Sequence, residues 1–414
     1  TGTQGAGNIT TNIGKANEKG GAQGQYSIAV GVNALADLSN TDAIAMGHNA
    51  NVSGDYSIAI GSNAKTQYID TIAIGKDAKA TGNHSVALGG ETESKGWHSV
   101  SVGYRAKNEG DNSISIGINA SSDSTSNNST VIGSNSSATI NAGNSVILGM
   151  QSTIKGSVSS SANGIAIGFG SQINDSLAAT AIGDSASISN LSNYGVGIGL
   201  AATVDNSAQG IALGYSASAK NSTSGISIGH GSEVSAALAI AIGAGAKASG
   251  EKSISIGTLN EVKGAKSSAI GDPSYIDTTA TGTHVQGNDN GTATNPIKAS
   301  ESTFMGNTNL AGTVGTTGIH VVGNNNSVDS SNVMVIGNGV NVGTGLDGAV
   351  VLGNTSSADQ YATATDSTIN GVTFEAAGYA GNTGLNNGSI VSVGATGAER
   401  QIKNVAAGAV TANS

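Results

Sequence analysis

The stretch Ser57–Gly61 reads SIAIG, and Thr71–Gly75, fourteen residues further along, reads TIAIG. With the glycine counted as position 0, the same five-residue pattern recurs 22 times in the 414 residues. Its glycines are residues 31, 47, 61, 75, 89, 103, 117, 133, 149, 168, 183, 199, 214, 229, 243, 257, 271, 287, 306, 323, 337 and 353. Most steps are 14 to 16 residues, which leaves room for two short strands and two tight turns but for no helix. The sequence therefore predicts an all-β solenoid of about 22 turns.

The residues before each glycine predict how the first strand of a turn is oriented. Position −1 is apolar in 21 of the 22 copies, and position −3 is Ile, Val or Met in 16. Positions −2 and −4 are mostly small, and because side chains alternate along a strand, these two sets lie on opposite faces. No Asp, Glu, Lys or Arg occupies positions −4 to −1, so we expect both faces to be buried. We assign the large Ile and Val side chains to the inside of the coil.

The strand after the glycine has small residues at +3 and +5 and often a lysine between them, as in Ala78-Lys79-Ala80. We expect the small side chains to point into the coil and the lysine to reach water. A second glycine often follows at +7, as at Gly54, Gly96 and Gly110, and there we expect a turn with positive φ.

The small-residue face of the first strand is then expected to be an outer surface. Over 22 turns this face would form a long stripe without charged residues. Such a stripe is unusual on the surface of a monomer and normally marks an interface with another chain. A parallel, rotationally symmetric homo-oligomer would bury the same face of every chain. The residues predicted to form this interface are Ala59, Ala73, Ala87, Ser101, Ser115 and Ala212.

Composition excludes several functional classes. The sequence has no cysteine, which excludes a disulfide framework and thiolate chemistry. The formal net charge of −10 argues against nucleic acid as a partner, because there is no basic stripe to neutralise phosphates. No run of 18 apolar residues is present that would span a membrane as a helix. Because the chain starts at Thr1 in a repeat-like context, we expect it to be a piece of a longer secreted protein.

Catalytic and metal-binding motifs are weak in this sequence. Gly225–Gly229 fits the pattern G-x-S-x-G, but Ser227 occupies the same −2 position as Ser115, so the repeat explains it. Residues 286–291 resemble a calcium loop that lacks the leading Asp and the closing Glu. The six histidines show no H-x-x-H or H-E-x-x-H spacing. We therefore expect no enzyme, no catalytic residue, no cofactor and no metal site.

Surface positions of the turns are better candidates for binding. Successive turns place Tyr56, Asp70, His84, His98 and Asn112 at position −5, with Trp97 beside His98. Exposed Trp, Tyr, Arg and His side chains are typical of hot spots for protein partners. The predicted ligand surface consists of Tyr56, His84, Trp97, His98, Tyr104 and Arg105. The alternative is that turns tolerate such residues and that Trp97 caps an edge of the coil.

Two signals together resemble a known family. The repeats, among them Asn144–Gly149 (NSVILG), are similar to the YadA-like head of trimeric autotransporter adhesins. Residues 399–408 (ERQIKNVAAG) resemble the neck that joins such a head to its stalk. The resemblance implies a left-handed parallel β-roll and a homotrimer. The neck residues would be Glu399, Arg400, Ile402, Asn404, Val405 and Gly408.

The resemblance also implies a domain plan. Residues 1–353 would form the head, most regular over 24–271 and degenerate over 272–353. Residues 354–398 would be an insert or connector, and 399–414 a neck leading to a coiled-coil stalk that is absent here, as is the C-terminal membrane anchor.

The expected function is attachment at the surface of a Gram-negative bacterium, anchored in the outer membrane and exported by type V secretion. Partners would be host cells, extracellular matrix proteins, abiotic surfaces or other bacteria, with roles in virulence, autoagglutination and biofilm. One alternative is a purely structural spacer of a longer fibre, with ligand binding elsewhere. An ice-binding solenoid and a polysaccharide-cleaving β-helix are further alternatives, but the sequence has neither a regular Thr-x-Thr face nor a carboxylate constellation for them.

Overall fold

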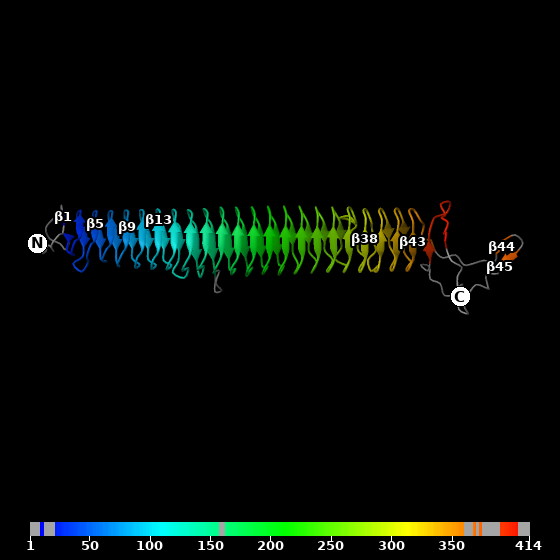
Figure 1. The fold of residues 1–414 in the computed structure, drawn as a ribbon, viewed down its shortest axis with the longest axis horizontal. Helices are drawn as coiled ribbons and strands as arrows, with labels where there is room; N and C mark the ends of the chain where they lie inside the picture. Colours follow the sequence, from blue (N-terminus) through cyan, green and yellow to red (C-terminus); the bar gives the residue numbers. More distant parts are fainter. Residues whose placement is uncertain are drawn as a thin grey trace. The chain divides into compact units, whose positions relative to one another are not determined.

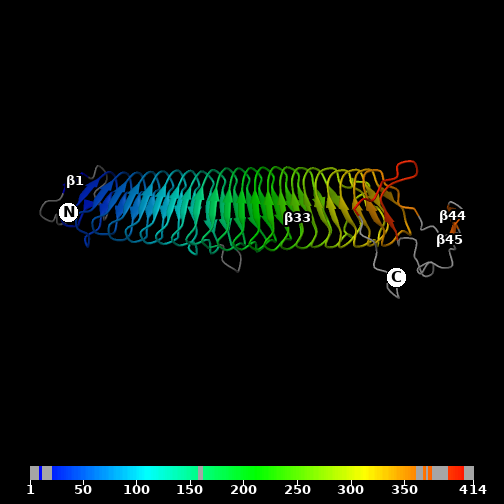
Figure 2. The ribbon, with the colours of Figure 1, turned by 45° about the vertical axis from the view of Figure 1, so that its right-hand side comes forward.

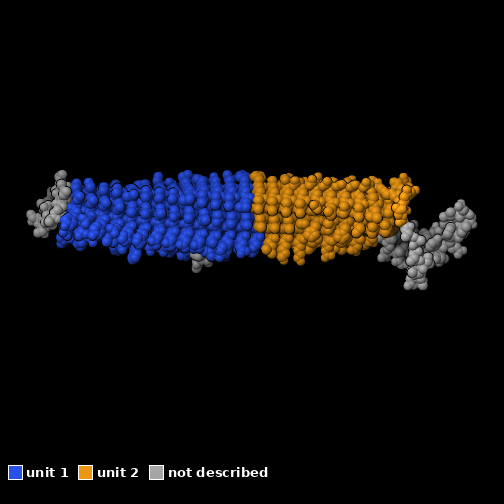
Figure 3. Space-filling model, viewed as in Figure 1, with its two compact units in different colours: residues 1–225 blue, residues 226–414 orange. Residues whose placement is uncertain are grey.

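The computed structural model is a parallel β-solenoid in which one sequence repeat is one turn (Figure 1). It describes residues 9–11, 21–156, 162–359, 367–369, 372–374 and 390–404. There are about 22 turns, as predicted, and the described residues contain no helix. The chain divides into two compact units, residues 1–225 and 226–414 (Figure 3). No helix in the described part is long and apolar enough to cross a membrane.

Unit 1 is built from two parallel sheets, one from the strand before each glycine and one from the strand after it (Figure 2). The strands of the first sheet are β1 (Ile9–Thr11), β3 (Ile28–Val30), β5 (Ile44–Met46), β7 (Ile58–Ile60), β9 (Ile72–Ile74), β11 (Val86–Leu88), β13 (Val100–Val102), β15 (Ile114–Ile116), β17 (Thr130–Ile132), β19 (Val146–Leu148), β21 (Ile165–Ile167), β23 (Thr180–Ile182), β25 (Val196–Ile198) and β27 (Ile211–Leu213). Those of the second sheet are β2 (Gly21–Ala22), β4 (Leu35–Ala36), β6 (Asn51–Val52), β8 (Lys65–Thr66), β10 (Lys79–Ala80), β12 (Glu93–Ser94), β14 (Lys107–Asn108), β16 (Ser121–Ser122), β18 (Ser137–Thr139), β20 (Thr153–Lys155), β22 (Gln172–Asn174), β24 (Ser187–Ser189), β26 (Thr203–Asp205) and β28 (Ser218–Lys220). Equivalent residues of successive turns pair, for example Ala59 with Ala73.

Unit 2 has the same two strand types. Before the glycines lie β29 (Ile226–Ile228), β31 (Ile240–Ile242), β33 (Ile254–Ile256), β35 (Ser268–Ile270), β37 (His284–Gln286), β38 (Thr303–Met305), β39 (His320–Val322), β41 (Met334–Ile336), β43 (Val350–Leu352) and β46 (Val391–Ser392). After them lie β30 (Glu233–Val234), β32 (Lys247–Ala248), β34 (Glu261–Val262), β36 (Tyr275–Ile276), β40 (Ser327–Val328) and β42 (Asn341–Val342). A separate antiparallel hairpin consists of β44 (Ser367–Ile369) and β45 (Val372–Phe374).

The repeated glycine is required by its backbone conformation and by crowding. Of the 22 glycines, all but Gly337 have positive φ, for example 130° at Gly31, a region that L side chains rarely adopt. A Cβ on Gly31 would also lie only 2.6 Å from the carbonyl oxygen of Gly47 in the next turn. Any other residue at position 0 would push successive turns apart, which explains why the glycine marks every turn.

The second glycine of the turn does not have the positive φ that we expect from the sequence. Gly54, Gly96 and Gly110 all lie outside that region, and the left-handed residue is instead the one at position −5, such as Tyr56 (φ 54°). Crowding explains the glycine here, because a Cβ on Gly110 would lie 2.7 Å from the carbonyl oxygen of Ser126.

The first strand faces the opposite way to our prediction. The residues predicted to form the trimer interface are completely buried inside their own chain; they are Ala59, Ala73, Ala87, Ser101, Ser115 and Ala212. The large neighbours point outward instead, and Ile74 remains 39% exposed. The assignment of these six residues to an interface between chains is therefore wrong, because a side chain with no exposed surface cannot contact another chain.

The size of the coil explains this reversal. Ala78 and Ala80 at positions +3 and +5 are buried, as the sequence predicts, so the second strand fills the coil from one side with small groups. Thr71 and Ala73 at positions −4 and −2 fill it from the other side. A coil narrow enough to pack these four small columns has no space for the Ile side chains at −1 and −3.

The interior of unit 2 changes along the chain. Near its start the buried residues are small, as at Ala239 and Ala241. Further on, larger side chains occupy the −2 position, including Val285, Phe304 and Val335. A buried asparagine column also runs through this part, in which Asn309 Nδ2 donates to Asn290 Oδ1 and Asn326 Nδ2 to Asn309 Oδ1, both at 3.0 Å. The later turns therefore enclose a larger and partly amide-bonded core.

The chain returns to the coil after residue 359. Strand β46 pairs in parallel with β43, so that Val391 lies opposite Val350. Part of the predicted connector, residues 354–398, thus adds to the stack of turns. The domain boundaries themselves stay predictions.

Candidate ligand-binding surface

The six residues predicted to form one ligand surface lie on two different edges of the turn. Position −5 precedes the first strand, and positions +1 and +2 follow it. Tyr56, His84 and His98 occupy position −5, with Trp97 beside them at −6, whereas Tyr104 and Arg105 follow Gly103. Seven residues separate His98 from Arg105, which is half of a 14-residue turn, so the strand Val100–Val102 lies between them.

The edge at position −5 is a row of exposed rings. Tyr56 is 55% exposed, Tyr68 at the neighbouring position −7 is 46% exposed, and Trp97 is 59% exposed. The rings of His84 and His98, one turn apart, are stacked with centroids 4.9 Å apart and planes 4° from parallel. We call Tyr56, Tyr68, His84, Trp97 and His98 the aromatic edge. Sequence reasoning missed Tyr68, whose exposed ring could have been found from its place two residues before the −5 column.

The backbone under the aromatic edge is held by hydrogen bonds between turns. The amides of Tyr56, His84 and His98 donate to the carbonyl oxygens of Thr41, Ile69 and Asn83, at 2.8 to 3.1 Å. The Trp97 amide donates to Asp111 Oδ1 at 2.7 Å. The rings therefore project from fixed positions, and little conformational entropy would be lost on binding.

The left-handed backbone at position −5 is unfavourable for ring-bearing residues. Tyr56, His84 and His98 have φ of 53–54°, a conformation that costs most residues roughly 1–2 kcal/mol and that Asn tolerates better. Later turns use Asn112, Asn128 and Asn144 in this position with the same conformation. The fold therefore does not need rings at this edge.

One acidic group contacts the aromatic edge directly. Asp70, the −5 residue of the turn before His84, places Oδ2 3.3 Å from His84 Nδ1, and both side chains are more than 40% exposed. Positions −6 and −5 over residues 55–112 carry Asp55, Asp70 and Asp111 but no lysine or arginine. The edge combines rings with hydrogen-bonding groups and has no lysine or arginine of its own.

Tyr104 and Arg105 belong to a separate cluster around Glu91. Arg105 Nε lies 2.7 Å from Glu91 Oε2, and the Tyr104 hydroxyl donates to Glu91 Oε1 at 2.9 Å. Hydrogen bonds from Arg105 and then Tyr104 hold the pKa of Glu91 below its ordinary value. The Arg105 guanidinium also lies 4.8 Å from the Tyr104 ring centroid. The groups of this cluster are largely engaged with one another, which leaves fewer of them for a ligand.

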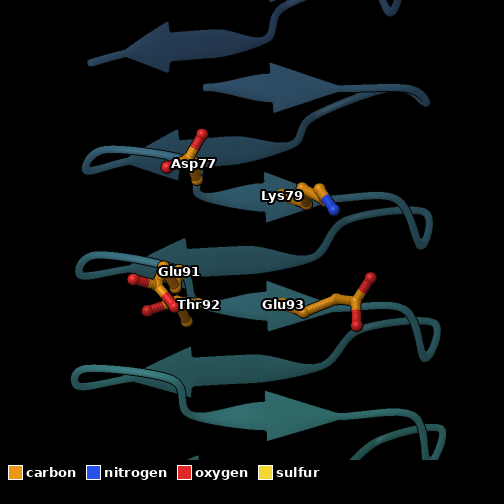
Figure 4. A pocket seen from close by; sticks show the side chains of 5 residues that line it. All are labelled: Asp77, Lys79, Glu91, Thr92 and Glu93. Carbon is orange, nitrogen blue, oxygen red and sulfur yellow. The ribbon is translucent and has the colours of Figure 1, made fainter. Parts of the chain in front are cut away.

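The second sheet presents the charged face of these turns. Lys79 lies opposite Lys65 and Glu93 in the stack, and Glu93 lies opposite Lys107. A surface pocket of about 370 Å³ lies here, lined by Asp77, Lys79, Glu91, Thr92 and Glu93. Figure 4 shows these five side chains.

The carboxylates of this pocket already have partners. Asp77 accepts from Asn63 Nδ2 at 2.8 Å, and that hydrogen bond keeps the pKa of Asp77 low. Glu93 contacts Lys95 Nζ at 3.1 Å. Among the described residues, no three His, Asp or Glu side chains are placed to hold a metal ion.

Ser227, the serine of the G-x-S-x-G match, is buried in the coil of unit 2. Its hydroxyl is hydrogen-bonded to the Ser232 hydroxyl at 2.7 Å, and no part of the residue is exposed. A nucleophilic serine must be able to reach a substrate, and this buried hydroxyl cannot. The burial agrees with the interpretation that Ser227 is a −2 residue of the repeat.

The predicted neck is described as far as residue 404, so Val405 and Gly408 lie outside the described residues. Arg400 bonds back to the last turns of its own chain, donating to Ser356 Oγ and the Val393 carbonyl oxygen at 2.9 Å and to the Asn354 carbonyl oxygen at 2.6 Å. Glu399 accepts from the Gly397 amide at 2.8 Å, which keeps its pKa low. Ile402 is 69% exposed, and Asn404 has a φ of 62°. A role of these residues between chains stays a prediction.

Comparison with known families gives one match. Seven segments match the YadA head domain repeat: residues 22–41, 39–64, 69–92, 96–120, 109–136, 235–260 and 248–274. No curated protein matches the chain. The matched segments include the turns of the aromatic edge, and, together with the β-solenoid, they are consistent with a YadA-like head of a trimeric autotransporter adhesin.

Proposed function

We propose that this chain, which carries YadA head repeats in a β-solenoid, is the head of a homotrimeric adhesin displayed on a bacterial surface. The YadA head repeats support an adhesin-type surface fibre. The trimer, the neck, the membrane anchor and the attachment partners are parts of the proposal.

The observation that carries the trimer is the outward apolar face of the first sheet. In unit 1 this face bears Ile, Val, Leu or Met at −1 on every turn and Ile or Val at −3 on all turns but those with Thr130 and Thr180. Ile74, Ile132 and Ile198 are each 39–40% exposed. Contiguous exposed apolar surface of this kind marks an interaction site. Equivalent faces of parallel chains could meet around a threefold axis, so that each chain covers its neighbours. The proposed interface therefore consists of the residues at positions −1 and −3, in place of those at −2 and −4 that the sequence predicted.

The mass in solution tests this assembly. With a trimeric coiled coil fused after Ser414 to stand in for a stalk, light scattering should give the mass of three 40.1 kDa chains plus the fusion. A mass that falls to one chain once the coiled coil is cleaved off, with unchanged circular dichroism, would mean that the apolar face does not hold the trimer.

Adhesion is tested separately. Beads coated with the trimer are expected to be retained on at least one of four surfaces: matrix protein, cultured cells, bacteria or plastic. Matched beads carry the coiled coil alone. Equal retention of both bead types on all four surfaces would favour the alternative in which this chain is a structural spacer and binding lies elsewhere in the fibre.

The outward face also bears on the ice-binding alternative. A regular threonine face is absent from it, since Ile58, Ile60, Ile72 and Ile74 occupy the outward positions of two successive turns. A measurement of thermal hysteresis in a solution of the monomeric chain would favour the ice-binding alternative.

A further inference from the structure

The aromatic edge carries an inference about the ligand. Its five rings come from four successive turns and lie at positions −7 to −5, before the first strand of each turn, where parallel stacking spaces successive turns by about 4.8 Å. The three largest rings, those of Tyr56, Tyr68 and Trp97, are about half exposed, so much of their surface does not pack against the coil. The left-handed conformation at Tyr56, His84 and His98 is one that Asn would adopt more easily.

The charges near the edge exclude some ligands. Positions −6 and −5 over residues 55–112 carry three acidic side chains, Asp55, Asp70 and Asp111, and no lysine or arginine. The nearby Lys95 has its ammonium between Glu93 and Glu109, at 3.1 and 2.9 Å. A polyanion, such as a nucleic acid or a sulfated glycan, would be repelled here. An uncharged ligand would not be.

The shape of the edge favours an extended ligand. Trp97 and Tyr56 are 59% and 55% exposed and belong to one continuous run of turns along the stacking direction. The spacing of one ring-bearing turn to the next is close to the rise of one sugar ring in an extended glycan. Sugar rings present a C–H face that packs on an aromatic ring, and hydroxyl groups that both donate and accept hydrogen bonds.

Hydrogen-bonding groups alternate with the rings in the same row. Asp70 offers a carboxylate beside His84, and Asn83 and Asn112 offer amides on the turns next to Trp97. Each of these groups can bond a hydroxyl without carrying a positive charge. We propose that the aromatic edge binds an uncharged, extended polysaccharide laid along successive turns, with its sugar rings on Tyr56, Tyr68 and Trp97 and its hydroxyls on Asp70, Asn83 and Asn112. This inference rests on the proposed function in that it names the ligand class of the adhesin.

Trp97 provides the test, because it is the only tryptophan in the sequence. The full chain is titrated with cellohexaose, chitohexaose and mannohexaose while the tryptophan emission is recorded. At least one of the three should shift the emission saturably, and the corresponding disaccharide should bind at least tenfold more weakly, because it reaches fewer turns. No shift with any of the three hexasaccharides would overturn the proposal, as would a shift that only sulfated glycans or a matrix protein produce.

Variants separate a specific row from general stickiness. Tyr68→Ala and Asp70→Asn should each weaken binding of the hexasaccharide about tenfold. The Trp97→Ala chain has no tryptophan emission, so it is tested on an immobilised polysaccharide, where it should no longer be retained. Tyr56→Ala should also weaken binding about tenfold, and Tyr194→Ala is its matched control, since Tyr194 occupies the same −5 position as Tyr56, with φ 59°, and is 57% exposed on a distant turn. Equal losses in Tyr194→Ala and Tyr56→Ala would overturn the proposal. Loss of glycan binding in Trp97→Ala with bead adhesion intact would leave the adhesin function standing and overturn only this inference.

Discussion

The turns at Gly61 to Gly117 and the turns at Gly287 to Gly353 use the same backbone repeat with different distributions of side-chain volume. In the first set, position −2 inside the coil is Ala or Ser, and the outward positions are almost all Ile, Val or Leu. In the second set, position −2 is Val or Phe, and His284, Gln286 and His320 appear on the outward face. The early turns thus have their large apolar side chains only on the outward face, whereas the late turns have them both inside the coil and outside, where Met305 and Ile336 are 46% and 48% exposed. The comparison teaches that the late turns bury a large-residue core within the chain, which the early turns lack.

The largest expected effect is a charge placed in the small-residue core. Ala73→Lys puts an ammonium where no surface is exposed and no acid is available, which costs several kcal/mol. We expect the early turns to lose their β structure in circular dichroism. Lys79→Ala, on the exposed side of the second strand, is the control and should change stability by less than about 0.5 kcal/mol. If the two variants were equally stable, the small columns would not line the interior.

The large-residue core should respond to truncation. Phe304 is completely buried in unit 2, and Phe304→Ala should destabilise that unit by about 3–5 kcal/mol, because the coil cannot close around the cavity. Denaturant unfolding measures this change. The neighbour Met305 is 46% exposed on the outward face, so Met305→Ala should cost far less in the monomeric chain. Similar losses for both would contradict the inward placement of volume in the late turns.

How far the sequence predicts this fold depends on what each residue reports. Gly61 and its equivalents identify each turn, because the positive φ and the close approach of the next turn's backbone both require glycine. The number of turns and the positions of the strands therefore follow from the glycine spacing. The spacing does not determine which face of a strand points into the coil. The strand Ile58-Ala59-Ile60 has two uncharged faces, and the rule that large side chains point inward fails when the coil is very narrow. Ala78 and Ala80 carried the missing signal, since a coil packed by alanine on one side leaves little width for the other.

The candidate site was predictable only in part. The −5 column placed His84 above His98 correctly, because equivalent positions stack in register. Tyr104 and Arg105 were grouped with them because they are near in sequence, but half a turn separates the two sets and directs them to different edges. The engagement of Arg105 by Glu91 depends on a contact between turns, which spacing alone does not specify.

Association should distinguish the two regions if the proposed trimer is correct. Ile74→Asp places three like charges on the apolar face of the early turns and should weaken the trimer at least tenfold, while the monomer keeps its circular dichroism. His320→Asp alters a face that is already partly polar and should weaken it less. Analytical ultracentrifugation measures both dissociation constants. A larger effect at residue 320 would reverse the proposed dependence.

The smallest expected effect concerns acid stability and involves one carboxylate in each compact unit, Asp123 in unit 1 and Asp277 in unit 2. A hydrogen bond from the Thr279 amide keeps the pKa of Asp277 low, against the opposing effect of partial burial. For Asp123, partial burial would raise the pKa, but hydrogen bonds from the Ile140 amide, Ser126 and Thr125 together lower it. A lowered folded-state pKa means that the stability is present above the unfolded value, about 3.9, and is lost as the pH falls through the folded value.

Asp277→Asn and Asp123→Asn should therefore flatten the acid limb of the thermal midpoint below about pH 4. Each should lower the midpoint slightly at pH 7, because the ionised acceptor is lost. Midpoints measured from pH 2 to pH 7 check both claims. An acid limb as steep in the variants as in the parent chain would mean that these two carboxylates do not contribute to it.

The contact of Arg400 with the last turns bears on how the stack of strands is prevented from growing. An open sheet edge is a template on which other chains can polymerise. At this end, a guanidinium occupies the carbonyl oxygens of Asn354 and Val393 and covers Gly353, where even a Cβ would come within 2.8 Å of its carbon. Arginine donates hydrogen bonds but accepts none, so it cannot pass the ladder on to another strand. Arg400 thereby keeps these two carbonyl oxygens from pairing with a strand of another chain.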